Sequence, residues 1–440
     1  MPDRTRARAG VAAAGVTAEA VTPDDLRRAT TARVLRTLRE EGPASRVELA
    51  GRTGLSKATV GVVVARLERL GLLGAAEASE VGEPGAGSGP GSAAGAATRG
   101  RPARPVALRP GACWGLGLEV NVDYVAVAAV DLAGVVLTVQ VCAVRATSTG
   151  DERLTVLLDL LAEVLASPTC PDRHGLLGAV VAIPGLVDAA RHRVTWAPNL
   201  GAEGDEVGPR LAELLGPEVT VHVDNDATCA AYGERWHGAA QGAAHSLYLT
   251  GTVGIGAGIV ADGRVLRGAV GNAGEVGHVP LGRPGAPCGC GRTGCWETAV
   301  GLGAMLAAVG AEESGTPVES AAAVAERART VPSVRAGLEA VAEDLARGLA
   351  VLVSVVDPEV VVLGGYFTAL TEHLLRPAAE RLDGLLPSPA QRRPPLVAGR
   401  LGITAAAVGA AELAMEPVVA GQVGLPEPAT APGGRGVTPA

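Results

Sequence analysis

The chain has 440 residues, of which 48% are apolar and only 2% aromatic, so its core must be built from Ala, Val and Leu. At ~100–200 residues per domain this length allows two to four domains. No stretch approaches ~18 uninterrupted apolar residues, so we expect no membrane span, and the Ala- and Gly-rich start makes a poor signal peptide. Seven cysteines are too few for a disulfide framework, and the clustering of three of them favours a metal site in a reducing cytoplasm.

The formal net charge of −8 conceals an asymmetry along the chain. Residues 1–110 hold 17 Lys and Arg against 11 Asp and Glu, whereas residues 111–440 hold 21 against 35. A basic head on an acidic body indicates that only the head meets a polyanion. Chance placement of the charges is the alternative.

The chain order predicts a head, a long α/β body and unstructured ends. We expect a disordered arm over 1–22, a flexible wing or linker over the Gly- and Ser-rich run 82–98, and a disordered tail over 421–440. Between linker and tail, apolar strand-like runs alternate with helical stretches, which predicts an α/β fold. The strand-like runs are 114–120, 124–132, 177–185, 219–225, 245–260 and 360–365, and the helical stretches are 153–166, 209–215 and 338–355.

The head carries the pattern of a helix-turn-helix. Apolar residues at helical spacing predict a helix over 24–40, and Ser45 with Glu48 forms a capping box for a second, short helix. Gly54 supplies the turn, and Ser56 caps a third helix over 56–69 that would enter a major groove. The segments after this helix could pair as a two-stranded wing. A small three-helix module for protein interaction is the alternative.

Small and polar side chains lie off the buried stripe of the third helix, in its first turn, where base edges are reached. The only Lys of the chain, Lys57, is one of them. Arg101 lies between Gly and Pro, a shape that can enter a narrow minor groove, although it could equally be a solvated linker charge. The residues that we expect to contact DNA are Ser45, Arg46, Ser56, Lys57, Ala58, Thr59 and Arg101.

One motif in the body has the spacing of metal ligands. His278, Cys288, Cys290 and Cys295 follow the pattern H-x9-C-x-C-x4-C, with Gly289, Gly291 and Gly294 allowing tight turns between them. Three thiolates and one imidazole form the closed tetrahedral set of a structural zinc site. We therefore expect one Zn²⁺ per chain without a hydrolytic role.

Two stretches resemble the ROK family (repressor, open reading frame, kinase). The run 26–73, with its SRVELA and TGLSKATV segments and the later GRPA, resembles the winged helix of ROK repressors, similar to those of the xylose and N-acetylglucosamine type. The run 249–278 and the Cys-rich block after it resemble the ROK body. The resemblance implies a winged helix-turn-helix over 23–110, then a two-lobed, actin-like sugar-kinase fold with lobes of about 111–227 and 228–420 and a sugar cleft between them.

The matched motifs imply which residues hold a sugar. Carboxylates and amides recognise hydroxyls in pairs, and His278 could ligate zinc through one ring nitrogen while the other faces a hydroxyl. In family kinases the position of Asp226 is the general base, although an Asp there could also be a helix N-cap. The sugar-binding residues implied by the resemblance are Asn199, Asn225, Asp226, Glu275, His278 and Glu297.

The first phosphate-binding hairpin of family kinases is altered in this chain. The family's Asp-x-Gly-Gly-Thr is matched by Glu119, Asn121, Val122 and Asp123, so side chains replace the glycines that let backbone N–H groups approach phosphate. Asp123 adds a charge whose repulsion for phosphate is ~4 kcal/mol at 4 Å and an effective dielectric near 20. We therefore expect no catalytic residue and no ATP or Mg²⁺, with Asp226 a vestigial base.

These patterns favour a sugar-responsive regulator, more a repressor than an activator. Its expected partners are double-stranded operator DNA and a sugar effector, with no membrane. We expect it to be a cytoplasmic homodimer or homotetramer. The alternatives are an ATP-dependent ROK sugar kinase fused to a DNA-binding head and, less favoured, a constitutive DNA-binding protein without a ligand.

Overall fold

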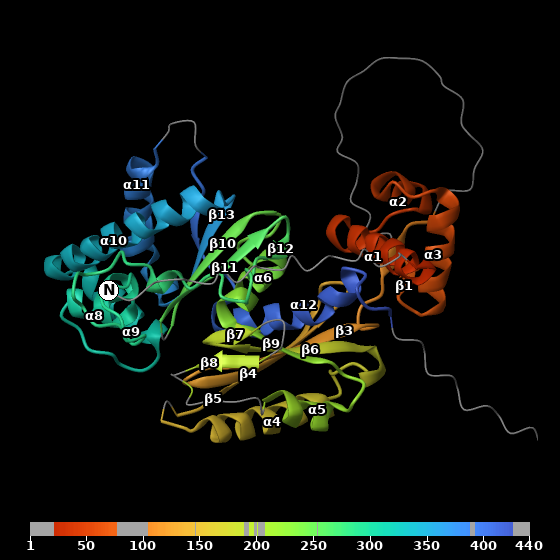
Figure 1. Ribbon diagram of the computed structural model, residues 1–440, viewed down its shortest axis with the longest axis horizontal. Helices are drawn as coiled ribbons and strands as arrows, with labels where there is room; N and C mark the ends of the chain where they lie inside the picture. Colours follow the sequence, from red (N-terminus) through yellow and green to blue (C-terminus); the bar gives the residue numbers. More distant parts are fainter. Residues whose placement is uncertain are drawn as a thin grey trace, which may run out of the picture.

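The computed structural model describes residues 22–76, 104–145, 147–188, 193–197, 200, 207–252, 254–387 and 392–425. It shows a small helical head beside two larger lobes (Figure 1). The predicted flexible run 82–98 lies outside the described residues, as do nearly all of the predicted arm and most of the predicted tail. Two expected binding residues, Arg101 and Asn199, lie outside them as well.

The head consists of three helices whose ends follow from their capping residues. They are α1 (Pro23–Glu41), α2 (Arg46–Thr53) and α3 (Lys57–Arg69). The predicted capping box is confirmed, because the Ser45 backbone N–H donates to Glu48 Oε2 at 2.7 Å and the Glu48 N–H donates to Ser45 Oγ at 3.3 Å. Gly54 turns the chain after α2 in the left-handed region, with φ of +68°, which explains a Gly at this position.

A short wing completes the head. Strand β1 (Leu73–Ala75) pairs antiparallel with β2 (Val106–Leu108), and Leu73 lies opposite Leu108. Ala44, just before α2, exchanges backbone hydrogen bonds with Val106. The wing strands are therefore fixed to the helices, and the predicted winged helix-turn-helix is confirmed.

The first lobe is a five-stranded sheet with two helices on one face (Figure 1). The strand order is β5-β4-β3-β6-β9, with β3, β6 and β9 parallel and β4 and β5 antiparallel to their neighbours. A two-stranded hairpin, β7–β8, lies beside it. The elements are β3 (Trp114–Val120), β4 (Tyr124–Asp131), β5 (Val136–Ala143), α4 (Gly150–Ala166), a 3-10 turn (Arg173–Gly175), β6 (Leu176–Ile183), β7 (Leu186–Asp188), β8 (Arg193–Trp196), α5 (Val207–Leu215) and β9 (Val221–Asn225).

The second lobe repeats this plan with a sheet of order β12-β11-β10-β13-β14. Strand β10 pairs parallel with β13 and antiparallel with β11, and helices cover one face around a large apolar cluster. The strands are β10 (Ser246–Gly251), β11 (Ile255–Ala261), β12 (Arg264–Val265), β13 (Val360–Gly365) and β14 (Leu396–Ala398). The helices are α7 (Glu297–Val300), α8 (Leu302–Ala308), α9 (Pro317–Ala328), α10 (Pro332–Val356) and α11 (Arg376–Leu385), with short 3-10 or π turns at Val276–His278, Tyr366–Leu370, Thr371–Leu375 and Gly402–Thr404.

Two helices lie between the lobes and pack against each other. Helix α6 (Asp226–His237) contacts β10 and β11 of the second lobe, whereas α12 (Ala405–Val419) contacts β3, β4 and β6 of the first. A Cβ built on Gly409 would lie 1.7 Å from the Cys229 carbonyl oxygen, and one on Gly233 would lie 2.5 Å from the Ala405 oxygen. The two backbones therefore touch. The expected division near residue 228 places α12 with the second lobe, but the chain returns to the first sheet for its last helix.

Helix α12 and the turn before it form a long apolar segment. Within the described residues one helical window, Gly402–Val419, is long and apolar enough to cross a membrane, with a mean hydropathy of 1.3. Thr404, Glu412, Glu416 and Pro417 interrupt this window, so it is no uninterrupted apolar stretch. In the structure 72% of this window is buried, so it is a core helix between the two sheets.

Candidate functional site

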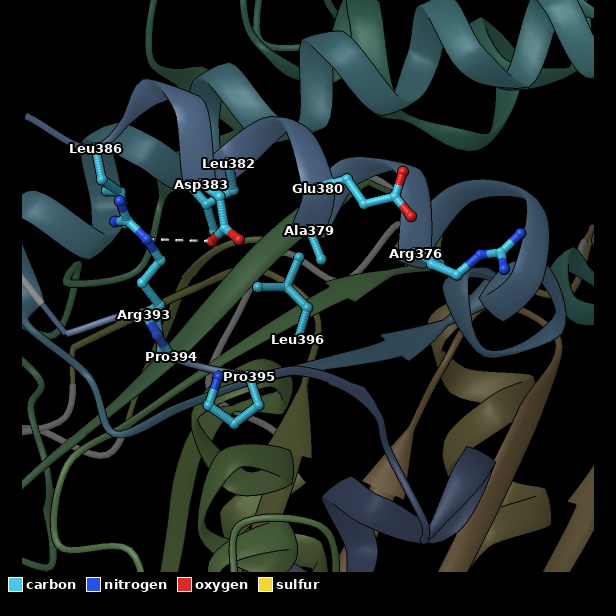
Figure 2. Close-up of a pocket in the computed structure, with 10 residues that line it drawn as sticks. All are labelled: Arg376, Ala379, Glu380, Leu382, Asp383, Leu386, Arg393, Pro394, Pro395 and Leu396. Carbon is cyan, nitrogen blue, oxygen red and sulfur yellow. Dashed lines mark ion pairs between the residues drawn. The ribbon is translucent and has the colours of Figure 1, made fainter. Parts of the chain in front are cut away.

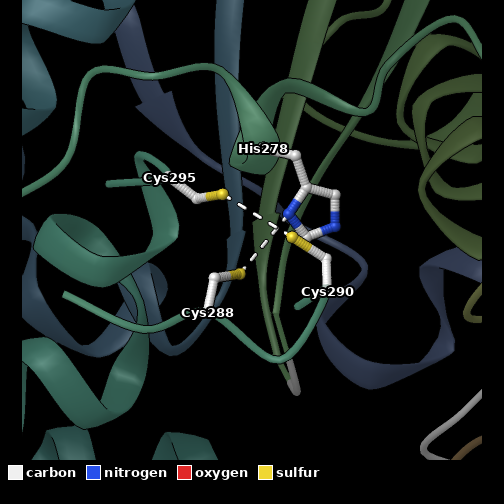
Figure 3. Close-up of side chains that lie close together, drawn as sticks. All are labelled: His278, Cys288, Cys290 and Cys295. Atoms are coloured by element: carbon white, nitrogen blue, oxygen red, sulfur yellow. Dashed lines mark hydrogen bonds between the residues drawn. The ribbon is translucent and has the colours of Figure 1, made fainter. Parts of the chain in front are cut away.

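Four side chains with metal-ligating atoms come together at the edge of the second lobe (Figure 3). The ligand atoms of His278, Cys288, Cys290 and Cys295 all lie within 4.8 Å of one another. His278 Nδ1 lies 3.6 Å from Cys288 Sγ, and the Sγ atoms of Cys290 and Cys295 are 3.7 Å apart. Tetrahedral Zn–S bonds of ~2.3 Å place sulfurs ~3.8 Å apart. The donor set and its spacing therefore fit a four-coordinate metal.

Local backbone and charge prepare this cluster. Gly291 and Gly294 adopt φ of +82° and +75°, so they make the turns between ligands that the sequence predicts, whereas Gly289 does not need a left-handed conformation. Hydrogen bonds from the backbone and side chain of Arg292 lower the pKa of Cys290 to about 6. Because the thiolate is the ligand form, Arg292 favours metal binding.

A pocket of about 500 Å³ lies directly beside the cluster, between the lobes. This volume is typical of small-molecule sites, which span about 300–1,000 Å³. Its first-lobe wall comes from the β7–β8 hairpin and its second-lobe wall from the segment around the metal cluster. The lining residues are Leu186, Trp196, Asn272, Glu275, His278, Val279, Cys290 and Arg292.

His278 belongs to both the metal cluster and the pocket. Its Nδ1 faces Cys288, and its Nε2 lies 3.9 Å from Glu275 Oε2 on the pocket wall. Burial raises the pKa of Glu275, an effect that the nearby His278 opposes. One ring nitrogen of His278 thus lies among the potential metal ligands and the other lies near Glu275 on the pocket wall, and the double role expected of this imidazole stays a prediction.

The first turn of α6 holds the predicted Asn–Asp pair. Asn225 is the N-cap: its Oδ1 accepts from the Thr228 N–H at 3.0 Å, and its Nδ2 donates to the Gly185 oxygen at 3.2 Å. The alternative role of Asp226 as N-cap is therefore wrong. Burial, with a contribution from the charge of Glu275, raises the pKa of Asp226 to about 6. Asp226 lies close enough to Glu275 for the two carboxylates to repel each other.

Glu297 is engaged in a different way. Its Oε2 accepts from the N–H of Ile255, the first residue of β11, at 3.1 Å, and its Oε1 lies 3.7 Å from Cys288 Sγ. Among the sugar-binding residues expected from the sequence, Glu275 and His278 line the pocket. The roles of Asn225, Asp226 and Glu297 in holding a sugar remain predictions.

Sequence reasoning missed three features of this region. Trp196, which is 39% exposed to solvent, lines the first-lobe wall of the pocket, and Asn272 lines the opposite wall. Arg267 of the second lobe donates to Asp224 Oδ2 of the first at 2.6 Å, an ion pair across the lobes. Trp196 stands three positions before the expected sugar residue Asn199, in a chain with few aromatic residues. This position in the sequence could have identified Trp196 as a site residue.

The altered hairpin between β3 and β4 is filled by a buried polar network. Tyr124 Oη donates to Glu119 Oε1 at 2.5 Å, and Asn121 Nδ2 donates to the same oxygen at 3.1 Å. The other Glu119 oxygen faces the backbone of Ala407 on α12 without a well-formed hydrogen bond. Burial raises the pKa of Glu119 to about 8, so this carboxyl is largely protonated at neutral pH.

The expected DNA-contacting residues that the structure describes differ in their exposure and in their hydrogen bonds. Lys57 and Ala58 are exposed at the start of α3, and Thr59 Oγ1 lies 2.8 Å from Ser56 Oγ in the cap. Arg46 is exposed but donates to Glu68 at 2.9 Å. Ser45 is only 7% exposed because its side chain caps α2, so a DNA contact there would have to use the backbone.

A second hollow, of about 300 Å³, lies between α11 and β14 (Figure 2). Its charged side chains are partly paired with each other, with Arg393 Nε 3.6 Å from Asp383 Oδ1. None of the predicted site residues lines it. The pocket beside the metal cluster is therefore the candidate site.

The fold and the site together define a DNA-binding winged helix joined to a two-lobed body, with four potential metal ligands beside the pocket between the lobes. The profile of the ROK family matches residues 115–416, and a profile described as winged helix-turn-helix DNA-binding matches residues 27–73. The chain belongs to the ROK family.

Individual relatives include regulators and kinases. The chain is 28% identical over 298 residues to the xylose repressor of Caldicellulosiruptor bescii, covering 64% of this chain and 73% of the relative. A ROK family transcriptional regulator, a homologue of the E. coli MLC protein, matches in structure with a TM-score of 0.73 at 23% identity, over 90% of this chain and 98% of the other. A ROK glucokinase from Streptomyces griseus, solved with glucose and AMPPNP, gives 0.57 at 27% identity, over 69% of this chain and 99% of its own.

Proposed function

We propose that this protein is a transcription regulator that binds operator DNA through its head and a sugar in the pocket between its lobes, and that it acts as a repressor. The observation that carries the proposal is the presence in one chain of a winged helix and a pocket walled by a candidate metal ligand, His278. The glucokinase that it resembles is matched over nearly all of its length by 69% of this chain. The likeness to that enzyme therefore does not account for the whole chain.

The head supports DNA binding by its geometry and charge. Helix α3 begins with exposed Lys57 and Ala58, the positions from which a recognition helix reaches base edges. Thr59 follows them in the same turn. The excess of basic residues before position 110 favours contact with phosphates.

The pocket supports a polar, ring-shaped ligand such as a sugar. Glu275 offers carboxylate oxygens, His278 offers a ring nitrogen, and the half-exposed indole of Trp196 offers a flat apolar face. Hydroxyl groups need paired donors and acceptors, whereas the C–H face of a pyranose packs on apolar surface. The wall thus combines the two kinds of surface that such a ring presents.

Zinc is the metal that best suits the cluster. Three cysteine thiolates and one imidazole are typical zinc ligands, and His278, Cys288, Cys290 and Cys295 would hold the ion with no position left open. When bound, the ion would act as a structural centre that fixes the His278 ring. The protein's own residues then position the sugar: the ring's Nε2 and the carboxylate of Glu275 face the pocket from one side.

The buried polar network in the hairpin between β3 and β4 argues against phosphoryl transfer, so we infer that this protein is not an enzyme. Asn121 is 2% exposed and hydrogen-bonded to Glu119 in the place where family kinases have glycine. The backbone of the same turn is held by Arg153, whose guanidinium donates to the Val122 oxygen at 3.0 Å. Phosphoryl transfer depends on a cradle of backbone N–H groups and metal. Retained Asp226 favours the rival, an ATP-dependent sugar kinase with a DNA-binding head.

The proposal includes the protein's setting. A helix-turn-helix protein gains specificity by binding a pseudo-palindrome as a dimer, so we propose a homo-oligomer. We propose that it acts in the cytoplasm, where a bacterial regulator meets DNA and where cysteines stay available as metal ligands.

Operator binding with and without sugar tests the function. An operator is selected from random DNA and labelled with a fluorophore. Its affinity for the protein is then measured by fluorescence anisotropy without sugar and with D-xylose, D-glucose or N-acetylglucosamine. We expect at least one sugar to weaken binding without ATP. Selection that enriches no sequence would contradict DNA recognition. A parallel assay of ADP release that gave turnover of ~1–100 per second would establish the kinase instead.

A further inference from the structure

The head is docked on the two helices that separate the lobes. Its helix α1 contacts α12, and the apolar cluster of the head continues without a break into α12, where Val418 and Val419 belong to the same cluster as Val34 and Leu35. Arg36 on α1 donates to the Val419 carbonyl oxygen at 3.0 Å. The orientation of the head is therefore set by the body.

Arg39 on α1 contacts both interlobe helices at once. Its guanidinium forms a buried ion pair with Glu412 of α12, with the two side chains 3% and 0% exposed. The same guanidinium lies over the Trp236 ring of α6, 4.2 Å from its centroid. Because α12 packs on the first lobe and α6 on the second, one side chain of the head touches an element of each lobe.

Neighbouring residues complete a junction that we define as Arg39, Glu40, Arg235, Trp236, His237 and Glu412. His237 Nε2 of α6 lies 2.6 Å from Glu412 Oε1, so Glu412 joins α6 and α1 through its two oxygens. Arg235 of α6 lies 3.7 Å from Glu40 of α1 and 4.6 Å from the Trp236 ring on which Arg39 also lies. The head thus contacts α6 through Arg235 and Trp236, in the last turn of that helix.

The other end of α6 lies near the wall of the candidate sugar pocket. The helix begins at Asp226, next to its cap Asn225 and near Glu275 on the pocket wall. Twelve residues at 1.5 Å each span about 18 Å. A rigid helix therefore joins the site to the junction, and no flexible segment lies between them.

The junction is built so that a small shift disturbs it. Among the described residues five buried side-chain polar atoms lack a protein hydrogen-bond partner, and three of them, Arg39 Nε, Arg235 Nε and Trp236 Nε1, lie here. The backbones of α6 and α12 touch at Gly233 and Gly409, where no side chain separates the helices, so a shear motion of the lobes would slide one helix along the other. Such sliding would separate Trp236 from Glu412, and Arg39 could not then keep both its ion pair with Glu412 and its contact with the Trp236 ring.

We infer that Arg39 is a positioning residue that reads the register of α6 against α12 and transmits the state of the sugar pocket to the DNA-binding head. The inference rests on the proposed function and adds the route of its regulation. Sugar that draws the lobes together displaces α6, the ion pair and the ring contact of Arg39 no longer coincide, and the head reorients. A buried pair that must break to permit this keeps the two states distinct.

Arg39→Gln tests this route, with Arg27→Gln as its matched control. Arg27 lies on the same helix and carries the same charge, but it pairs at the surface with Asp24. For each variant, operator affinity is measured by anisotropy with and without the sugar to which the wild type responds most among D-xylose, D-glucose and N-acetylglucosamine. Sugar affinity without DNA and the melting temperature are measured in parallel. We expect a wild-type effect within the ~5–150-fold range of allosteric coupling.

In Arg39→Gln we expect the sugar effect on operator binding to fall below about twofold, whereas Arg27→Gln keeps the wild-type effect. The DNA-free Arg39→Gln protein should bind the sugar at least as tightly as the wild type, because no buried pair has to break. Arg39→Lys, which keeps the charge but lacks the planar group that stacks on Trp236, should give an intermediate effect. If Arg39→Gln does not fold, Glu412→Gln supplies the same test with a side chain of equal size. A wild-type sugar effect in a folded Arg39→Gln protein overturns the inference alone, whereas a wild type that responds to no sugar overturns the proposed function.

Discussion

Tyr124 Oη donates a 2.5 Å hydrogen bond to Glu119 Oε1 in the hairpin where family kinases hold phosphate. Both side chains are on strands of the first sheet or at their ends, and the carboxyl is 1% exposed. Because burial raises the pKa of Glu119, its protonated form would add no charge to this hairpin. The same hydrogen bond therefore bears on the stability of the first sheet and on the proposal that this hairpin does not hold phosphate.

Glu119→Gln should change how stability depends on pH. Burial raises the pKa of Glu119 to about 8, so between pH 4.5 and 8 the folded protein holds a proton that the unfolded chain releases. Wild-type stability should therefore fall as pH rises through this window, with a slope from this group approaching ~1.4 kcal/mol per pH unit. Gln mimics the neutral form and removes that contribution. Urea unfolding from pH 5 to 9 measures the difference.

The exposed Glu326→Gln is the control for that series, because its partner Arg329 is also at the surface. It should keep the wild-type pH profile. Parallel profiles for wild type and Glu119→Gln would show that Glu119 is ionised in the folded protein, contrary to the neutral network.

Removing the Lys57 and Thr59 side chains should weaken operator binding. If α3 reads the major groove, removing a side chain that contacts a base costs roughly 1–3 kcal/mol, and the operator should be a pseudo-palindrome with half-sites one or two helical turns apart. The double variant Lys57→Ala, Thr59→Ala is compared with Arg329→Ala, which removes a cation from the body. Equal affinity of all three proteins for the selected operator would overturn the assignment of α3.

Metal loss should abolish the sugar response before it affects DNA binding. Cys290→Ser removes one of four ligands, so we expect zinc content to fall from one per chain toward none and the His278 ring to lose its fixed orientation. Cys142→Ser, a cysteine of β5 outside the cluster, should keep both metal and response. Elemental analysis and anisotropy provide the readouts. A wild-type protein that contains no zinc after purification without chelator would contradict the assignment of the four residues as zinc ligands.

Side chains of the pocket should separate sugar response from operator binding. Glu275→Ala should bind operator normally and no longer respond to sugar, since a hydrogen bond to a charged group is worth about 1.5–3 kcal/mol. Asp226→Asn should respond only at raised sugar concentration. Trp196→Ala should weaken sugar binding about tenfold or less, the size of an aromatic packing effect. Glu380→Ala in the hollow beside α11 is the control, and an equal loss of response there would argue against the pocket.

Local chemistry explains what the sequence could predict. Ser45, Gly54 and Ser56 define helix ends by interactions within a few residues, so the head was predictable to within one or two residues. The four metal ligands lie within 18 positions, and their spacing alone indicated the cluster. The strand runs 114–120 and 360–365 are apolar apart from Glu119, because both sheet faces are covered.

Relationships between distant segments were not predictable in this way. Arg39 and Glu412 are 373 positions apart, and nothing local marks either as a partner. The return of α12 to the first sheet has the same origin, because an alternating α/β pattern does not say which sheet a helix covers. The role of Trp196 depends on the β7–β8 hairpin facing a loop of the other lobe.

The central claim is that one protein couples a sugar in the interlobe pocket to DNA on the head without nucleotide. Linkage requires that a sugar that weakens operator binding by some factor is itself bound more weakly, by the same factor, when operator is present. Calorimetric titration of the effector sugar into the protein, alone and saturated with operator and in the absence of ATP, measures this directly. The account predicts two affinities that differ by the factor found for DNA; identical affinities, or sugar binding that appears only with ATP, would contradict it.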